Sequence, residues 1–279
     1  MRWIGVFVLC SCNQVFSLNA TRQIDAEPHQ FFDAPVDAPF TCPPIGTAPQ
    51  FSNLLHQVIP QDCSDYTISA SANRALGACL SPWGAAIAQG TVDGDLTVII
   101  PTDTIQRYRP RLAPEGDTML VYTFDPINGQ AFQELAWDGA SWTQVAVLPM
   151  PAQAGQITSP TRRPNRHVLI VSITGLDEYV DAGNNVWNPT LTHSHTQLGV
   201  INASSPFLSA DGLRLIIYGI TTGKGEAHAM YTDRTSVDSP FGAATPLTGV
   251  PTASDLFMTE DCSRIYMSGL QSIFYVQQR

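Results

Sequence analysis

The chain has 279 residues, a formal net charge of −10 and only 14 % charged residues, together with 20 Gly and 21 Pro. The small number of charged residues argues against a helical protein, and scattered Gly and Pro are typical of many short strands joined by turns. The net negative charge argues against nucleic acid and anionic membrane surfaces as partners, because both require a basic patch.

The first residues have the features of an export signal. Arg2 is followed by an apolar run over residues 3–9, which is too short to span a bilayer, and then by Cys10-Ser11-Cys12. Residues 9–12 resemble the lipobox of bacterial lipoproteins. That resemblance implies a signal peptide over residues 1–12 and a lipid on Cys12, with the outer membrane as the expected location. Ordinary cleavage near Ala20 and secretion is the alternative.

Residues 13–49 are rich in Pro, Ala and Asp and show no apolar period. A segment of this composition buries too little apolar surface to order itself, so we expect a disordered linker. The folded domain is expected to cover residues 50–279.

From residue 50 onward one pattern recurs five times: a short apolar stretch, a polar turn and a second strand. Its second residue falls at Ile68, Leu112, Pro160, Leu208 and Met258, so the repeat length is 44 to 50 residues. A period of this size with only strand signals inside is typical of propeller blades. The sequence therefore predicts an all-β fold, a five-bladed β-propeller.

The second unit shows four strands within one repeat. We expect them over residues 109–113, 118–124, 131–137 and 141–148, separated by turns that contain Asn-Gly and Asp-Gly pairs. The last unit ends before its fourth strand. We expect the N-terminal stretch, residues 50–58, to complete it and close the ring, because an open ring would leave unpaired edges.

Residues 205–216, in the fourth unit, read SPFLSADGLRLI. This Pro, apolar, Ser, Asp-Gly and alternating apolar pattern resembles the repeat of TolB-like, WD-repeat-like propellers of bacterial envelopes. The other units keep the outline but lose the motif; Asn73, Asn165 and Cys262 stand where the turn signal is expected. The resemblance implies a fold and says little about function.

Four cysteines lie beyond the leader, an even number in an exported context, which favours disulfides. Cys262 falls in the first turn of the last blade, and Cys42 directly precedes the strand expected to complete that blade. Cys63 precedes the first strand of the first blade and Cys79 lies near the far end of its second strand. Propeller topology thus pairs Cys42 with Cys262 and Cys63 with Cys79. Four free thiols are the alternative.

Equivalent positions just before each repeat core hold Asp65, Arg109, Ile157, Ser205 and Asp255. We expect these residues to ring one mouth of the central channel. The polar members, Asp65, Arg109, Ser205 and Asp255, are candidate ligand-binding residues. The alternative is that they cap strand ends and solvate the mouth.

Nucleophile-elbow, zinc-protease, phosphate-loop and dinucleotide motifs are missing from the sequence, so we expect no catalytic residue, metal or cofactor. His193 and His195 would share one face of a strand and could chelate a metal, but no third ligand is identifiable. We expect a monomeric, non-catalytic propeller that binds a protein or glycan of the cell envelope. The alternative is a glycoside hydrolase or lyase that acts at the channel mouth, with Asp65 and Asp255 as its carboxylates.

Overall fold

The computed structural model describes residues 42–59, 63–81, 84–101, 105–127, 129–149, 161–163, 167–171, 174–181, 187–209, 211–223, 225–252, 254–269 and 272–279. Residues 40–279 form one compact unit. The expected signal peptide, its Cys12 and most of the expected linker lie outside the described residues. Within the described ranges, no helix has the length and apolar character needed to cross a membrane.

The described residues form five four-stranded antiparallel sheets. The first sheet has β2 (Cys63–Ser69), β3 (Arg74–Ser81), β4 (Gly84–Gly90) and β5 (Thr97–Ile100). The second has β6 (Gln106–Leu112), β7 (Thr118–Asp125), β8 (Gly129–Trp137) and β9 (Trp142–Pro149). The third has β10 (Thr161–Arg163), β11 (His167–Val171), β12 (Gly175–Asp181) and β13 (Trp187–Ser194).

After the short helix α1 (His195–Leu198), the fourth sheet has β14 (Val200–Leu208), β15 (Arg214–Thr221), β16 (Ala227–Asp233) and β17 (Thr245–Pro246). The fifth sheet has β18 (Ser254–Met258), β19 (Arg264–Gly269), β20 (Ser272–Gln277) and, from the other end of the domain sequence, β1 (His56–Ile59).

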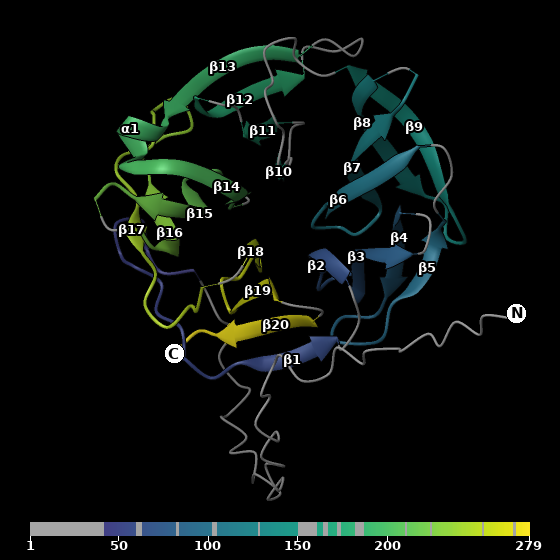
Figure 1. The fold of residues 1–279 in the computed structure, drawn as a ribbon, viewed down its shortest axis with the longest axis horizontal. Helices are drawn as coiled ribbons and strands as arrows, with labels where there is room; N and C mark the ends of the chain where they lie inside the picture. The colour runs from purple at the N-terminus through teal and green to yellow at the C-terminus, as the bar shows by residue number, and fades with distance from the viewer. Residues whose placement is uncertain are drawn as a thin grey trace, which may run out of the picture. The chain divides into compact units, whose positions relative to one another are not determined.

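The five sheets stand around a common axis, with β2, β6, β10, β14 and β18 innermost (Figure 1). Each innermost strand packs against the next one around the axis, and β18 packs against β2. The expected all-β propeller class is confirmed. The strands of the second sheet match their predicted ranges to within a few residues, because the Asn-Gly and Asp-Gly turns place the hairpins.

The core lies between the sheets, where apolar residues of the inner strands of neighbouring sheets meet. Phe207 of β14 packs edge-on against Phe257 of β18, with ring centroids 5.3 Å apart. The ring of Tyr66 in β2 contacts the ring of Tyr266 in β19, with ring centroids 5.1 Å apart. These rings belong to one buried cluster that joins the fourth, fifth and first sheets. Removing such aromatic surface from water stabilises each contact between sheets.

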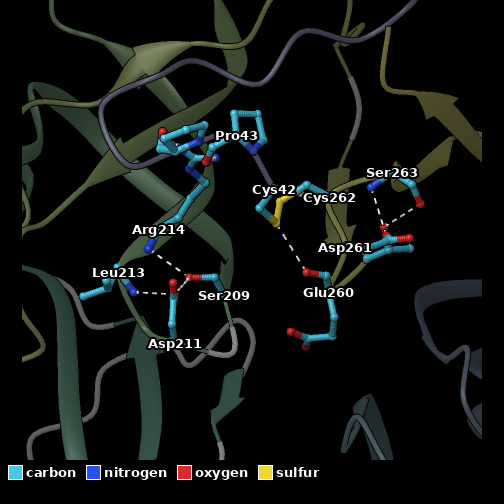
Figure 2. The surroundings of a disulfide bond; sticks show 12 residues. Cys42, Pro43, Ser209, Asp211, Leu213, Arg214, Glu260, Asp261, Cys262 and Ser263 are labelled. Atoms are coloured by element: carbon cyan, nitrogen blue, oxygen red, sulfur yellow. Dashed lines mark hydrogen bonds between the residues drawn. A yellow bond between two sulfur atoms is a disulfide. The ribbon is translucent and has the colours of Figure 1, made fainter. Parts of the chain in front are cut away.

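The turn between the first two strands of a sheet follows one hydrogen-bonding plan in the fourth and fifth sheets (Figure 2). In the fourth, the Arg214 amide donates to Ser209 Oγ at 2.9 Å, and Gly212 adopts a φ of 69°. In the fifth, the Arg264 amide donates to Thr259 Oγ1 at 3.0 Å, and Cys262 adopts a φ of 59°. Cys262 therefore occupies the glycine position of the motif.

The fourth strand of the fifth sheet comes from the N-terminal side of the domain, as expected. β1 pairs antiparallel with β20, and a further bridge joins Phe51 to Gln278 (Figure 1). The pairing strand is shorter than predicted, because within residues 50–59 the chain runs as an isolated bridge at Phe51 before it enters the ladder at His56.

Both predicted disulfides are present, Cys42–Cys262 and Cys63–Cys79. The first connects the chain ahead of β1 with the first turn of the fifth sheet, so it joins the two ends of the domain covalently (Figure 2). The second joins directly opposed residues of β2 and β3. The alternative of four free thiols is wrong.

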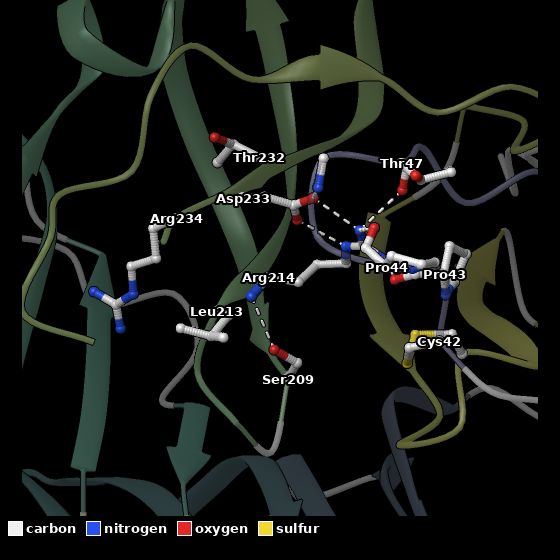
Figure 3. A network of polar contacts seen from close by, with 12 residues as sticks. Cys42, Pro43, Pro44, Thr47, Ser209, Leu213, Arg214, Thr232, Asp233 and Arg234 are labelled. Atoms are coloured by element: carbon white, nitrogen blue, oxygen red, sulfur yellow. Dashed lines mark hydrogen bonds and ion pairs between the residues drawn. A yellow bond between two sulfur atoms is a disulfide. The ribbon is translucent and has the colours of Figure 1, made fainter. Parts of the chain in front are cut away.

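Residues 42–49, which we call the strap, correct the expectation of a linker that is disordered up to residue 49. Arg214 of β15 is 2 % exposed and forms a two-point ion pair with Asp233, with both N–O distances 2.8 Å. The same guanidinium donates to three strap carbonyls, those of Pro43, Pro44 and Thr47 (Figure 3). The Gly46 amide donates to Asp233 at 2.7 Å. Composition failed here because hydrogen bonds to backbone carbonyls and the Cys42–Cys262 disulfide hold the strap in place, and neither depends on a high apolar content.

Candidate functional site

Four of the five equivalent positions hold polar residues, and these four lie in the same kind of β-bulge on the innermost strands. In each strand, two residues stand opposite one residue of the neighbouring strand, and the first of the two is the candidate residue. The four candidates are Asp65 on β2, Arg109 on β6, Ser205 on β14 and Asp255 on β18. The fifth equivalent, Ile157, lies outside the described residues.

All four candidate residues have a left-handed backbone conformation. Their φ values are 54° for Asp65, 56° for Arg109, 47° for Ser205 and 53° for Asp255. Glycine is the usual residue at the first position of such a bulge, because a Cβ there costs about 1 kcal/mol. Strain repeated at equivalent positions by polar residues is a feature of functional sites.

The bulges bring the candidate side chains together in pairs. Arg109 Nε lies 3.8 Å from Asp65 Oδ1, which links the first and second sheets. The Ser205 hydroxyl donates to Asp255 Oδ1 at 3.4 Å, which links the fourth and fifth sheets. Asp65 and Ser205 are buried, whereas Arg109 and Asp255 are half-buried and give the group its access to solvent.

Arg111 is a fifth member, which the sequence analysis did not single out. It follows Arg109 by two residues on β6, is 4 % exposed, and interacts electrostatically with both Asp65 and Asp255. The available signal was a third arginine in β6, after Arg107 and Arg109, on an innermost strand where an unpaired buried charge is costly. Asp65, Arg109, Arg111, Ser205 and Asp255 together are called the inner-strand cluster below.

The cluster opposes ionisation of its most buried carboxyl group. Burial and, second to it, the charge of Asp255 raise the pKa of Asp65 to about 7, against the opposite effects of Arg111, Arg109 and the Ser64 hydroxyl. The cluster contains two carboxyl groups and two guanidinium groups, so its net charge is zero when both carboxyls are ionised. Near neutral pH, Asp65 exchanges a proton easily.

Two polar atoms of the cluster have no hydrogen-bond partner among the described residues. They are Asp65 Oδ1, an acceptor, and Arg111 Nη2, a donor. The other carboxylate oxygen of Asp65 accepts from the Ser64 hydroxyl at 3.3 Å, and Arg111 Nη1 donates to the Pro110 carbonyl at 3.2 Å. Buried polar groups are nearly always hydrogen-bonded, so an orphaned acceptor and donor in one cluster indicate a place for a ligand group or water.

His193 and His195 do not form the chelating pair that strand alternation suggested. β13 ends at Ser194, which caps α1, so His195 begins a helix and no longer alternates with His193. His193 Nε2 lies 3.0 Å from Glu178 Oε1, and the Phe241 amide donates to Nδ1 at 3.3 Å. Both ring nitrogens are therefore engaged in structural contacts.

Glu178 and His193 instead belong to a buried contact between the third and fourth sheets. Arg234 Nη1 donates to Glu178 Oε1 at 2.7 Å, and all three residues are at most 3 % exposed. Burial acts to raise the pKa of Glu178, but the hydrogen bond from His193 and the charge of Arg234 lower it overall. This triad holds neighbouring sheets together and is not a candidate binding site.

A cavity of about 600 Å³ lies elsewhere, between the first turns of the first and fifth sheets. Its polar walls are engaged with one another: Arg264 and Tyr266 both bond to the Asp93 carboxylate, the tyrosine hydroxyl at 2.8 Å. These contacts join the fifth sheet to the first, so we interpret the cavity as part of the seam between them.

No protein-family model and no curated protein sequence matches the chain. Solved structures with a similar fold include the catalytic domain of the GH62 α-L-arabinofuranosidase of Coprinopsis cinerea, with a TM-score of 0.56, 14 % identity, and coverage of 83 % of this chain and 97 % of that one. A gluconolactonase of Xanthomonas campestris matches with a TM-score of 0.50 and 11 % identity, over 77 % of this chain and 71 % of that chain.

TolB of Acinetobacter baumannii matches with a TM-score of 0.48 and 16 % identity. The match covers 78 % of this chain and 54 % of TolB, so the chain spans about half the length of that protein. The matches to the arabinofuranosidase and the gluconolactonase, with TM-scores of 0.56 and 0.50, support the propeller fold alone, because identities of 14 % and 11 % say nothing about function.

Proposed function

We propose that the chain is a five-bladed, non-catalytic binding propeller of the bacterial cell envelope, which takes a small polar ligand at the inner-strand cluster. The observation that carries this proposal is the orphaned pair of Asp65 Oδ1 and Arg111 Nη2, both buried among strained, polar bulge residues. The cluster residues lie on strands that are hydrogen-bonded into sheets, so the backbone positions them before any ligand arrives. A glycan or a protein side chain of the envelope would supply the ligand group.

Export is part of the proposal and has separate support. Two disulfides in a domain of this size are typical of an oxidising, extracytoplasmic compartment. We propose that the chain is anchored through a lipid on Cys12 and faces its ligand as a monomer. Mass spectrometry of the mature N-terminus decides this point: a lipid-modified Cys12 is expected, and an unmodified terminus near residue 20 would contradict anchoring.

Equilibrium binding to a glycan and peptide array tests the ligand site. We expect at least one class of ligand to bind the full chain and to lose affinity in Arg111→Met and Asp255→Ala. The exposed Asp238 lies in a loop of the fourth sheet, so Asp238→Asn is the matched control and should bind like the parent. Binding that all three variants retain would remove the inner-strand cluster from the proposal.

Glycoside hydrolysis is the second candidate function. A carboxyl group with a pKa of about 7 beside a second carboxyl group is the arrangement that acid catalysis on glycosides requires. Hydrolysis of an aryl-glycoside panel that disappears in both Asp65→Asn and Asp255→Asn would favour the enzyme. Binding without hydrolysis would favour the non-catalytic propeller.

A further inference from the structure

The inner-strand cluster also indicates the chemical class of its ligand, an inference that rests on the proposed function. The orphaned groups are one acceptor, Asp65 Oδ1, and one donor, Arg111 Nη2. A hydroxyl group both donates and accepts a hydrogen bond, so a single hydroxyl that reaches both atoms would satisfy both. A carboxylate only accepts and an ammonium group only donates, so each would satisfy one and oppose the other.

The charge of the cluster favours an uncharged ligand. Asp65 faces Asp255, Arg109 and Arg111, which gives two negative and two positive groups. A cation entering the site would meet two guanidinium groups, and an anion would meet two carboxyl groups. Because the surroundings are buried and poorly screened, an unmatched ligand charge would be costly there.

The remaining cluster groups can bind more than one hydroxyl. Ser205 and Asp255 form one hydroxyl–carboxylate pair at 3.4 Å, and Arg109 is half-exposed on the other side of Asp65. Several donors and acceptors within one cluster match the surface of a sugar, which carries several hydroxyls.

We propose that the cluster binds an uncharged sugar unit, with one sugar hydroxyl donating to Asp65 Oδ1 and accepting from Arg111 Nη2. The sugar hydroxyl then replaces the missing partners of both buried groups. Its neighbouring hydroxyls would reach Ser205, Asp255 and Arg109. The bulges fix the backbone at Asp65, Arg109, Ser205 and Asp255, and Arg111 follows the bulge of β6.

Isothermal titration calorimetry on the full chain tests the ligand class. The probes are methyl glycosides of neutral pentoses and hexoses, the matching uronic acids and the matching 2-amino sugars. We expect at least one neutral glycoside to bind at least tenfold more tightly than its uronic acid and its amino sugar. Tighter binding of either charged series would overturn the inference while leaving ligand binding by the cluster in place.

The pH dependence gives a test that needs no variant. The bound hydroxyl donates to ionised Asp65, so protonation of that carboxyl should weaken binding. We expect the affinity for the neutral glycoside to be constant above pH 8 and to fall by about tenfold per pH unit well below pH 7. An affinity that rises as the pH falls would mean that protonated Asp65 donates to the ligand, which contradicts the proposed contact, and a flat profile would remove Asp65 from the contact.

Variants distinguish loss of the proposed sugar contact from loss of the folded structure. Asp65→Asn and Arg111→Lys should each weaken binding of the neutral glycoside at pH 8 by at least tenfold, while Asp238→Asn leaves it unchanged. Unfolding curves of each variant show whether it is folded at the temperature of the titration. If neutral glycosides bind equally to all three variants, the inference is wrong; if no probe and no array ligand binds the parent, the proposed function fails as well.

Discussion

At the scale of single residues, the protein places polar side chains where the backbone resists them. Asp65, Arg109, Ser205 and Asp255 all adopt positive φ, and Asp65 is in addition buried beside a second carboxyl group. Each of these features is destabilising by itself. Their repetition at one structural position in four sheets is the reason for interpreting them as a site and not as accidents of packing.

Asp65 should make the stability of the protein depend on pH. In the folded state it keeps its proton up to about pH 7, whereas in the unfolded chain it releases the proton near pH 4. Between these values the folded state binds more protons, so the free energy of unfolding should fall as the pH rises from 4 to 7. Asp65→Asn should remove that fall and gain about 1–3 kcal/mol at pH 8 relative to the parent.

Denaturant unfolding at pH 5 and pH 8 measures this effect. Asp238→Asn, at an exposed position, should keep the fall seen in the parent. Equal pH dependence in the parent and in Asp65→Asn would show that Asp65 ionises normally in the folded state.

Cys262 has two structural roles that can be separated. It forms the disulfide to Cys42, and it occupies the glycine position of the turn with a φ of 59° (Figure 2). Cys262→Gly and Cys262→Ala both remove the disulfide, but only glycine adopts this conformation without strain. We expect the glycine variant to be more stable than the alanine variant by about 1 kcal/mol in urea unfolding. Equal stabilities would mean that the turn relaxes around either residue.

At the scale of elements, contacts between neighbouring sheets are polar as well as apolar. The Glu178–Arg234 pair joins the third and fourth sheets, and the Arg264–Asp93 pair joins the fifth and first. The strap adds a backbone segment that Arg214 and Asp233 hold against the fourth sheet while Cys42 ties it to the fifth. Several of the few charged residues of the chain therefore form ion pairs that connect neighbouring sheets or hold the strap.

Arg214→Lys should loosen the strap. Lysine keeps the charge beside Asp233 but lacks the planar fork that reaches the strap carbonyls, so several part-buried hydrogen bonds would lose their donor (Figure 3). We expect a loss of about 2 kcal/mol in the free energy of unfolding and faster hydrogen exchange at the Gly46 amide. The exposed C-terminal residue provides the control, Arg279→Lys, which should change neither quantity.

At the scale of the whole molecule, the ends of the domain are joined in one sheet. β1 pairs with β20, and the Cys42–Cys262 bond adds a covalent link over 220 residues of sequence. A cross-link that closes so long a loop removes many conformations of the unfolded chain. Ring closure therefore links the stability of the first and last sheets.

Deleting residues 50–59 should abolish cooperative unfolding. The deletion removes β1 and exposes the backbone edge of β20, which leaves the fifth sheet with three strands. Thermal melting followed by circular dichroism should show a broad, shallow transition. Removing residues 1–39, which precede the compact unit, is the control and should leave the transition sharp. A deletion variant that melts like the parent would show that closure is dispensable.

The sequence alone determined the β-propeller class, the closing strand and both disulfide pairs. Repeats, turn residues and cysteine positions can be read along the chain, and once the fold is known to repeat, equivalent positions can be placed next to one another in space. It also located four members of the inner-strand cluster by their equivalent positions. The tertiary structure alone decided the rest. Arg111 belongs to the cluster because its charge interacts with Asp65 and Asp255 from other sheets. The Arg214 guanidinium binds the strap from more than 160 residues away in the sequence. His193 forms a hydrogen bond with Glu178 within the third sheet and so is not available as a metal ligand with His195. These contacts form between side chains from distant segments of the sequence. The repeat pattern along the chain therefore does not predict them.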